Sequence, residues 1–164
     1  MYPQKKKMSN RTIKNVLISV YYKDNLEPVL KQLKRLNANI YTTGGTQLFV
    51  EKQGMIVHRI EDLTGYPSIL GGRVKTLHPN VFGGILARQD IQEDLETLAQ
   101  YNIPVFDLVV VDLYPFQETL ANTSIQEEII EKIDIGGISL IRAAAKNYKD
   151  VLIVCSADDY NLVI

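Results

Sequence analysis

The chain has 164 residues, of which 46% are hydrophobic and 23% are charged, and its formal net charge is −1. These values are those of an ordinary globular protein, and the length suits one domain with one sizeable core. The single cysteine, Cys155, excludes an intramolecular disulfide, and no run approaches the ~18 apolar residues of a membrane span. No apolar segment of a signal peptide follows the basic N-terminus, so we expect a cytoplasmic protein from a reducing compartment.

The first fourteen residues are basic. They contain five of the 18 basic residues and no acidic residue, which leaves 13 basic against 19 acidic residues and a net charge of −6 for the remainder. Such a segment could bind nucleic acid or a membrane surface, or it could be a disordered end. We adopt the last interpretation and predict a flexible tail over residues 1–14, a domain over residues 15–164, and neither nucleic acid nor membrane as a partner.

Strands and helices alternate in the first part of the domain. The apolar run 15–20 predicts a strand, and leucines and a valine at helical spacing predict a helix over 26–36. A second strand is expected over 39–42, a helix over 46–54, and a third strand over 56–60. Residues 61–80 hold three glycines and two prolines without clear periodicity, and long irregular loops of this kind are usually functional.

The second part continues the alternation. Order returns over 81–86, followed by an acidic helix over 92–101 and a strand over 107–113 that we expect at the centre of the sheet. Helices over 125–133 and 139–147, a strand over 151–154 that makes Cys155 a core residue, and a helix near 158 follow. The fold class is therefore α/β, with a three-layer, doubly wound, mostly parallel sheet that binds ligands beyond the carboxyl ends of its strands.

A glycine turn joins a strand to a helix at Thr42-Thr43-Gly44-Gly45-Thr46. Glycine backbone lets an anion approach, the hydroxyls can donate to it, and the N-terminus of the helix favours negative charge. Two glycines between a strand and a helix are also an ordinary turn, so the motif alone leaves both interpretations open.

The loop 71–79 places Arg73, Lys75 and His78 within six residues. The guanidinium and the ammonium can bind one anionic ligand, although a solvated basic loop has the same composition. We interpret His78, which precedes Pro79, as a structural loop residue rather than a base.

Three further residues are candidates for chemistry. Asp134, before Gly136-Gly137, can act on a ligand or merely cap a helix. Lys146 follows three alanines, one helical turn after Arg142, and is either a lysine with a lowered pKa or a surface residue. Tyr114 ends the strand over 107–113, where an α/β sheet binds ligands, or is a turn residue before Pro115.

Taken together, these segments resemble the IMP cyclohydrolase domain of bifunctional purine biosynthesis proteins, which has the methylglyoxal-synthase-like fold. The resemblance runs from about Val16 to Tyr160, and its markers are Ile18-Ser19-Val20 with Lys23, Thr43 to Thr46, Gly72 to Pro79, Gly84 to Arg88, Leu113 to Phe116, Ile133 to Gly137, and Arg142 to Asn147.

The resemblance implies ring closure of 5-formamidoimidazole-4-carboxamide ribotide to IMP with loss of water, without a cofactor or metal. It implies a catalytic group of Lys75, Tyr114, Asp134 and Lys146. The residues expected to bind the ribotide are Ser19, Lys23, Thr43, Gly44, Gly45, Thr46, Arg73, Thr76, Asp112, Ile135 and Gly136. A homodimer is implied, and a formyltransferase domain in cis in a longer parent protein, of which this chain would be a C-terminally truncated part.

The sequence departs from the family pattern at three places. Tyr21-Tyr22 stands where the family commonly has Ser-Asp, Asp112 replaces the usual Asn, and Tyr148 replaces a common His. A carboxylate at 112 accepts hydrogen bonds but donates none, so contacts there should change. The main alternative function is a nucleotide-binding regulatory module of the same fold. Methylglyoxal synthase ranks lower, because the loop from Gly72 to Pro79 does not resemble that enzyme's.

Overall fold

The structure, a computed structural model, describes residues 11–164 and contains one five-stranded sheet in that range. The strands are β1 (Asn15–Ser19), β2 (Asn39–Thr42), β3 (His58–Arg59), β4 (Leu108–Val111) and β5 (Leu152–Val154). Their spatial order is β3-β2-β1-β4-β5, and all four pairings are parallel. The predicted α/β class with a parallel sheet is confirmed.

The side chains of the interior strands alternate between two hydrophobic cores. In β1, Val16 and Ile18 pack into one core and Leu17 into the other, and all three are fully buried. In β4, Leu108 and Val110 alternate in the same way with their neighbours. Because successive strand residues point to opposite faces, continuous apolar runs are what a sheet covered on both faces requires.

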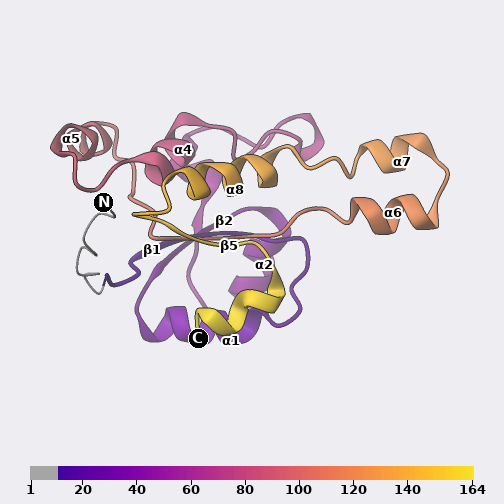
Figure 1. Ribbon diagram of the computed structural model, residues 1–164, viewed down its shortest axis with the longest axis horizontal. Coiled ribbons are helices and arrows are strands. Elements are labelled where there is room, and N and C mark those ends of the chain that lie inside the picture. The colour runs from indigo at the N-terminus through magenta and orange to yellow at the C-terminus, as the bar shows by residue number, and fades with distance from the viewer. Residues whose placement is uncertain (1–10) are drawn as a thin grey trace, which may run out of the picture.

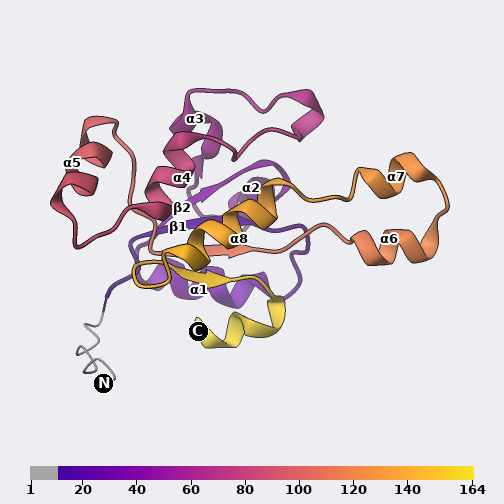
Figure 2. The same cartoon turned by 45° about the horizontal axis from the view of Figure 1, so that its top comes forward.

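Helices cover both faces, giving three layers (Figure 1). One layer holds α1 (Leu26–Arg35), α2 (Gly44–Lys52) and the 3₁₀ helix η2 (Ala157–Leu162), and the other holds α3 (Ile60–Thr64), α4 (Pro79–Leu86) and α8 (Gly136–Lys146). The remaining elements are η1 (Leu70–Gly72), α5 (Gln92–Gln100), α6 (Phe116–Asn122) and α7 (Gln126–Ile130). Figures 1 and 2 show α6 and α7 side by side, projecting from the layers as an arm. None of the helices in residues 11–164 has the length and hydropathy needed to cross a membrane.

Several predicted boundaries were wrong. The third strand is only two residues long, because Ile56 is 90% exposed and α3 begins directly after Arg59. The helices expected to begin at 46 and 139 begin at Gly44 and Gly136, because the glycines belong to the first helical turn and not to the preceding loop. The helix α6 was not predicted. The strand over 107–113 is interior, but β1 occupies the centre of the sheet.

The expectation that Cys155 is a core residue was also wrong: it is exposed. The strand before it, β5, lies at the edge of the sheet. Val154 is buried there, while Leu152 is 49% exposed. An apolar run on an edge strand therefore buries only some of its side chains. Cys155 comes directly after this strand and is exposed to solvent.

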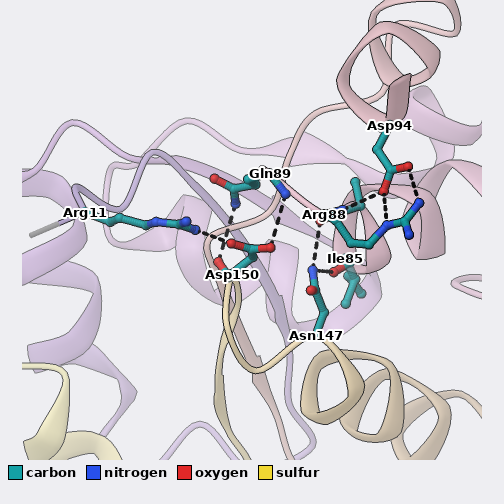
Figure 3. Close-up of polar contacts among 8 residues, drawn as sticks. Arg11, Ile85, Arg88, Gln89, Asp94, Asn147 and Asp150 are labelled. Carbon is teal, nitrogen blue, oxygen red and sulfur yellow. Dashed lines mark hydrogen bonds and ion pairs between the residues drawn. The ribbon is translucent and has the colours of Figure 1, made fainter. Parts of the chain in front are cut away.

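Polar contacts hold the amino-terminal edge of the sheet together (Figure 3). Arg11 donates to Asp150 at 2.6 Å, and the other Asp150 oxygen accepts the backbone N–H of Gln89. Arg88 makes a two-point contact with Asp94 and holds the pKa of that carboxyl at about 2. A lowered pKa means that this contribution to stability is present above about pH 4 and is lost as the pH falls towards 2.

Of the predicted basic tail, residues 1–14, the structure describes residues 11–14, and these lie at the amino-terminal edge of the sheet. Besides the contact of Arg11, the backbone N–H of Lys14 donates to Asp107 at 2.8 Å. Residues 11–14 therefore lie against the domain. The remaining tail residues, Lys5, Lys6 and Lys7 among them, lie outside the described residues.

Asn147 fixes the end of α8 in the same region. Its buried carboxamide donates to the carbonyl oxygens of Ile85 at 2.8 Å and Ala87 at 2.9 Å. We expect Asn147→Ala to lower the free energy of unfolding by about 1–3 kcal/mol, because it leaves buried carbonyls without a donor. Urea denaturation measures the change, with exposed Asn161→Ala as the control. Equal midpoints for the two variants would contradict the assignment.

Candidate active site

A cavity of about 540 Å³ lies beyond the carboxyl ends of the strands. Its walls come from four parts of the chain: the end of β1 with the following turn, the N-terminus of α2, the loop 71–77, and the segments that flank the arm, 112–114 and 130–137. The volume is in the range of small-molecule sites, and the position is where parallel α/β sheets bind ligands.

Positive charge gathers at one end of the cavity, around the N-terminus of α2. The ideal Cβ position of Gly45 lies 3.8 Å from Lys23 Nζ, and that of Gly44 lies 4.0 Å from Lys75 Nζ. Gly44 has a φ of +51°, a conformation that glycine adopts without strain. Two ammonium groups thus flank a helix N-terminus whose first N–H groups have no intrahelical acceptor, which is an arrangement that binds anions.

The two lysines differ in their contacts. Lys23 Nζ donates to the carbonyl oxygens of Val20 and Tyr21, both at 2.7 Å, so one of its three N–H groups remains for a ligand. Burial lowers the pKa of Lys23, and the Asp112 carboxylate opposes that shift. Lys75 is half-buried beside Gly72 and has no ion pair or hydrogen bond of its side chain within residues 11–164. A half-buried ammonium in a cavity is suited to an anionic or strongly polar ligand group.

The threonines of the site have different roles. The buried Thr46 hydroxyl donates to the carbonyl of Val20 at 2.9 Å and accepts its N–H at 3.3 Å, so it ties α2 to the end of β1. Thr43 lines the cavity, and its hydroxyl makes no hydrogen bond within the described part of the chain. Thr76 Oγ1 lies 3.1 Å from the ideal Cβ position of Gly136, so any larger residue at 136 would press on it.

Asp134 and Tyr114 meet at the other end of the cavity. One Asp134 oxygen accepts the N–H of Gly137 at 2.6 Å, and the other accepts the N–H of Tyr114 at 3.3 Å. The carboxylate therefore caps the start of α8 and at the same time lines the cavity, which combines the two interpretations that the sequence left open. The pKa of the Tyr114 phenol is raised, first by burial and then by Asp134 and Tyr21.

Asp112 acts as a double acceptor. Its two oxygens accept the backbone N–H groups of Tyr21 and Tyr22, the latter at 2.9 Å. An asparagine could accept only one of these N–H groups and would turn its own NH₂ towards the other. The carboxylate of Asp112 therefore satisfies both N–H groups of this turn at once.

We expect Asp112→Asn to destabilise the chain by about 1–3 kcal/mol, because one backbone N–H loses its acceptor. Thermal unfolding followed by circular dichroism measures this effect, and Asp159→Asn at an exposed position removes the same charge as a control. An Asp112→Asn chain as stable as the control would show that the two N–H groups find other acceptors.

Arg73 is bound by a neighbour rather than free. Its guanidinium makes an ion pair with Glu131, which follows α7, and its Nε lies 3.3 Å from the second carboxylate oxygen. Both side chains are more than half exposed. The pair joins the loop 71–77 to the base of the arm across the cavity. An anionic ligand at Arg73 would have to share or replace Glu131.

Thirteen of the fifteen predicted site residues line the cavity: Ser19, Lys23, Thr43, Gly45, Thr46, Arg73, Lys75, Thr76, Asp112, Tyr114, Asp134, Ile135 and Gly136. Gly44 lies beside it, next to Lys75. His78 accepts the N–H of Asn80 at the start of α4, as a structural residue would.

Lys146 does not line the cavity. It is the exposed last residue of α8, about 15 Å along the helix axis from Gly136. The next residue, Asn147, is bound to Ile85 and Ala87 at the amino-terminal edge of the sheet. The expectation that Lys146 shares a cavity with Lys75 is not met within the described chain.

Sequence reasoning missed the residues that the arm contributes. Ile130, Glu131 and Ile133 line the cavity, and so does Tyr21 from the turn after β1. No spacing in the sequence indicates that α6 and α7 fold back on each other, so the contact of 130–133 with the loop 71–77 could not be anticipated. Tyr21 could have been suspected from its position two residues before Lys23.

Comparison with known proteins gives consistent results. The family model described as "MGS-like domain" matches residues 25–139. The chain is 54% identical over 92% of its length to the bifunctional purine biosynthesis protein PurH of Bacteroides thetaiotaomicron, and 48% identical over 90% to PurH of Ligilactobacillus salivarius. It spans about 30% of the length of these curated relatives. A solved structure described as "Crystal structure of ForH" superposes with a TM-score of 0.79 at 39% identity, covering 92% of this chain and 76% of that one.

Proposed function

The chain belongs to the MGS-like domain family and matches one domain of PurH, and on this basis we propose that it is an IMP cyclohydrolase. The proposed reaction closes 5-formamidoimidazole-4-carboxamide ribotide to IMP and releases one water. The observation that supports it most is the half-buried ammonium of Lys75, which has no anionic partner in the described residues 11–164. It lies between the N-terminus of α2 and the cavity that also holds Tyr114 and Asp134.

The chemistry is intramolecular. The carboxamide nitrogen attacks the formyl carbon on the same imidazole and loses a proton, and a tetrahedral intermediate forms. The formyl oxygen receives two protons in all, one from the carboxamide nitrogen and one from the formamido nitrogen, and it leaves as water as the C–O bond breaks and the C=N bond of the new ring forms. Holding the carboxamide and formamido groups of the substrate in the reactive conformation contributes to the rate. Good orientation can lower a barrier by roughly 7–11 kcal/mol, and a substrate whose two groups are already tethered gains a part of this from the enzyme.

Asp134 is the proposed base for the amide proton. An amide nitrogen is a weak nucleophile, so a positioned base is required, and such a base commonly contributes about 10²–10⁴-fold. The carboxylate is held from both sides by the N–H groups of Gly137 and Tyr114, so its orientation towards the cavity is fixed before substrate binds.

Lys75 and Tyr114 are the proposed donors to the formyl oxygen and the departing water. Each donor of this kind commonly contributes about 2.7–4 kcal/mol. The ribose phosphate would lie on the N-terminus of α2, where Lys23 and the hydroxyl of Thr43 add donors. Because Lys75 Nζ also lies close to Gly44, a shared contact with the phosphate end is part of the proposal.

Lys146 enters the proposal through the family resemblance alone. The geometry of one chain gives it no contact with the cavity, so the proton transfer that we had expected it to share with Asp134 rests on Asp134 here. A loss of turnover in Lys146→Ala as large as in Lys75→Ala would require Lys146 to reach a cavity in another copy of the chain. A homodimer, a cytoplasmic location and a formyltransferase domain in cis are further proposals on the same basis.

The test is the absorbance change when the purified chain is mixed with the formylated ribotide, with IMP identified by chromatography. We expect IMP to form at a rate proportional to the chain concentration. A regulatory module of the same fold would bind IMP but leave the formylated ribotide unchanged, and this outcome would overturn the proposal.

A further inference from the structure

The turn after β1 contacts the arm through two tyrosines. The Tyr22 hydroxyl donates to Glu118 of α6 at 2.9 Å, and burial, followed by the contact with Glu118, raises the pKa of that phenol to about 12. Tyr21 packs its ring against Tyr114, with the centroids 5.6 Å apart and an interplanar angle of 67°. This edge-to-face arrangement is one of the favourable geometries of aromatic pairs.

A cation completes the contact. Lys132, which follows α7, places its Nζ 5.4 Å from the ring centroid of Tyr21 and 6.0 Å from that of Tyr114. Distances within about 6 Å are those of cation–π interactions. One ammonium from the arm therefore faces both rings, and the three side chains form a cluster at the mouth of the cavity.

The Tyr114 ring belongs to this cluster. Its backbone N–H is held by Asp134, but its hydroxyl makes no hydrogen bond within residues 11–164, and the side chain is 39% exposed. The ring packs against Tyr21 and is faced by Lys132. Tyr21 in turn is fixed through its own backbone N–H, which donates to Asp112.

We propose that Tyr21 is a positioning residue for Tyr114: its ring, held by Asp112 and faced by Lys132, sets the rotamer in which the Tyr114 phenol points at the reacting atoms. The proposal rests on the proposed function for the role of Tyr114. It makes Tyr21 a wall of the cavity whose effect on turnover passes through a second residue. The contact itself exists without ligand and can be measured separately.

The kinetic test uses four variants of the chain with the formylated ribotide. We expect Tyr21→Leu to lower kcat about fivefold to tenfold while KM stays within twofold, the size of effect that losing an aromatic pair and a cation–π contact allows. Tyr21→Phe keeps the ring and should recover most of the turnover. Lys132→Met should lower kcat in the same sense by a smaller factor, and Tyr101→Leu, a 60% exposed tyrosine at the far end of α5, is the matched control.

A double variant separates positioning from packing. In the Tyr114→Phe background the hydroxyl to be positioned is gone, so Tyr21→Leu should add no further loss of kcat. Losses that multiply in the double variant, or a Tyr21→Phe chain as slow as Tyr21→Leu, would overturn the proposal. If Tyr21→Leu does not fold, the comparison of Lys132→Met with and without Tyr114→Phe tests the same dependence.

A measurement without substrate keeps this inference apart from the proposed function. The aromatic resonances of Tyr114, observed by nuclear magnetic resonance in a tyrosine-labelled chain, should shift on Tyr21→Leu because the neighbouring ring is removed, and should be unchanged in Tyr101→Leu. Unchanged Tyr114 resonances in Tyr21→Leu would refute the contact. A wild-type chain that forms no IMP, with these shifts present, would refute the proposed function and the positioning role but leave the cluster itself established.

Discussion

Replacing Lys75 with methionine is expected to lower kcat about 10²–10³-fold, the range reported for removing one donor from an oxyanion site. Methionine preserves the length and the apolar stem of lysine, so the packing against Gly72 should be retained. The expected result follows from the position of the ammonium, which is half-buried in the cavity and lacks a protein anion within residues 11–164. Steady-state kinetics with the formylated ribotide gives kcat and KM separately.

The distribution of the loss decides the role of Lys75. A loss mainly in kcat assigns the ammonium to the formyl oxygen, as proposed. A rise of KM at constant kcat would place it at the phosphate end only, beside Gly44, and would contradict its catalytic role. Lys52→Met is the control, because it removes the same charge from the exposed far end of α2 and should leave both constants unchanged.

Replacing Asp134 with serine is expected to lower kcat about 10²–10⁴-fold, which is the usual contribution of a positioned base. Serine is an effective cap at a helix N-terminus and can accept the N–H of Gly137, so α8 should still begin at Gly136. Serine is not a base at neutral pH. The variant therefore separates the capping role of Asp134 from its proposed chemical role.

Two measurements on this variant are needed together. Circular dichroism should show an unfolding temperature within a few degrees of the wild-type chain, and the turnover assay should show the large loss. A folded Asp134→Ser chain with at least half of the wild-type turnover would mean that the carboxylate is only a helix cap. Asp134→Asn, which can also cap the helix, should behave in the same way.

The interior of the sheet could be predicted from the sequence because the amino-acid composition of its strands indicates buried strands. The runs at 16–18 and 108–111 are apolar on both faces, as strands covered by helices on both sides must be, and the run at 39–42 contributes Ile40 to one core and Tyr41 to the other. The edge strands were predicted less well. β3 has only two residues and both are exposed, and β5 carries an exposed leucine, so their patterns do not obey the same rule.

The location of the candidate site was predictable where local motifs specify it. The turn at 43–46, the loop at 72–76 and the segment at 134–136 all reach one cavity, because each follows or precedes an element whose end lies at the same edge of the sheet. Lys146 was expected at the same cavity but does not line it, for a geometric reason. A residue ten positions into a helix that starts at the cavity is carried about 15 Å away from it.

Two of the three departures from the family pattern are connected in the structure. In the sequence, Tyr21-Tyr22 and Asp112 are separate differences from the family pattern. In the structure, Asp112 accepts the backbone N–H groups of both tyrosines. These contacts join positions about 90 residues apart in the chain, and a single sequence read without an alignment does not indicate them. The arm raises the same difficulty, since the ion pair of Arg73 with Glu131 depends on how α6 and α7 fold back.

We propose that one cavity both binds the phosphate-bearing ribotide and closes its ring. A single-turnover experiment tests it most directly, with the purified chain in excess over the formylated ribotide and the products separated after defined times. We expect the wild-type chain to convert the ribotide to IMP in one exponential phase. We expect Lys75→Met and Asp134→Ser to slow this phase at least about 100-fold although the ribotide is fully bound. Conversion at the uncatalysed rate by the folded wild-type chain with bound ribotide would contradict it.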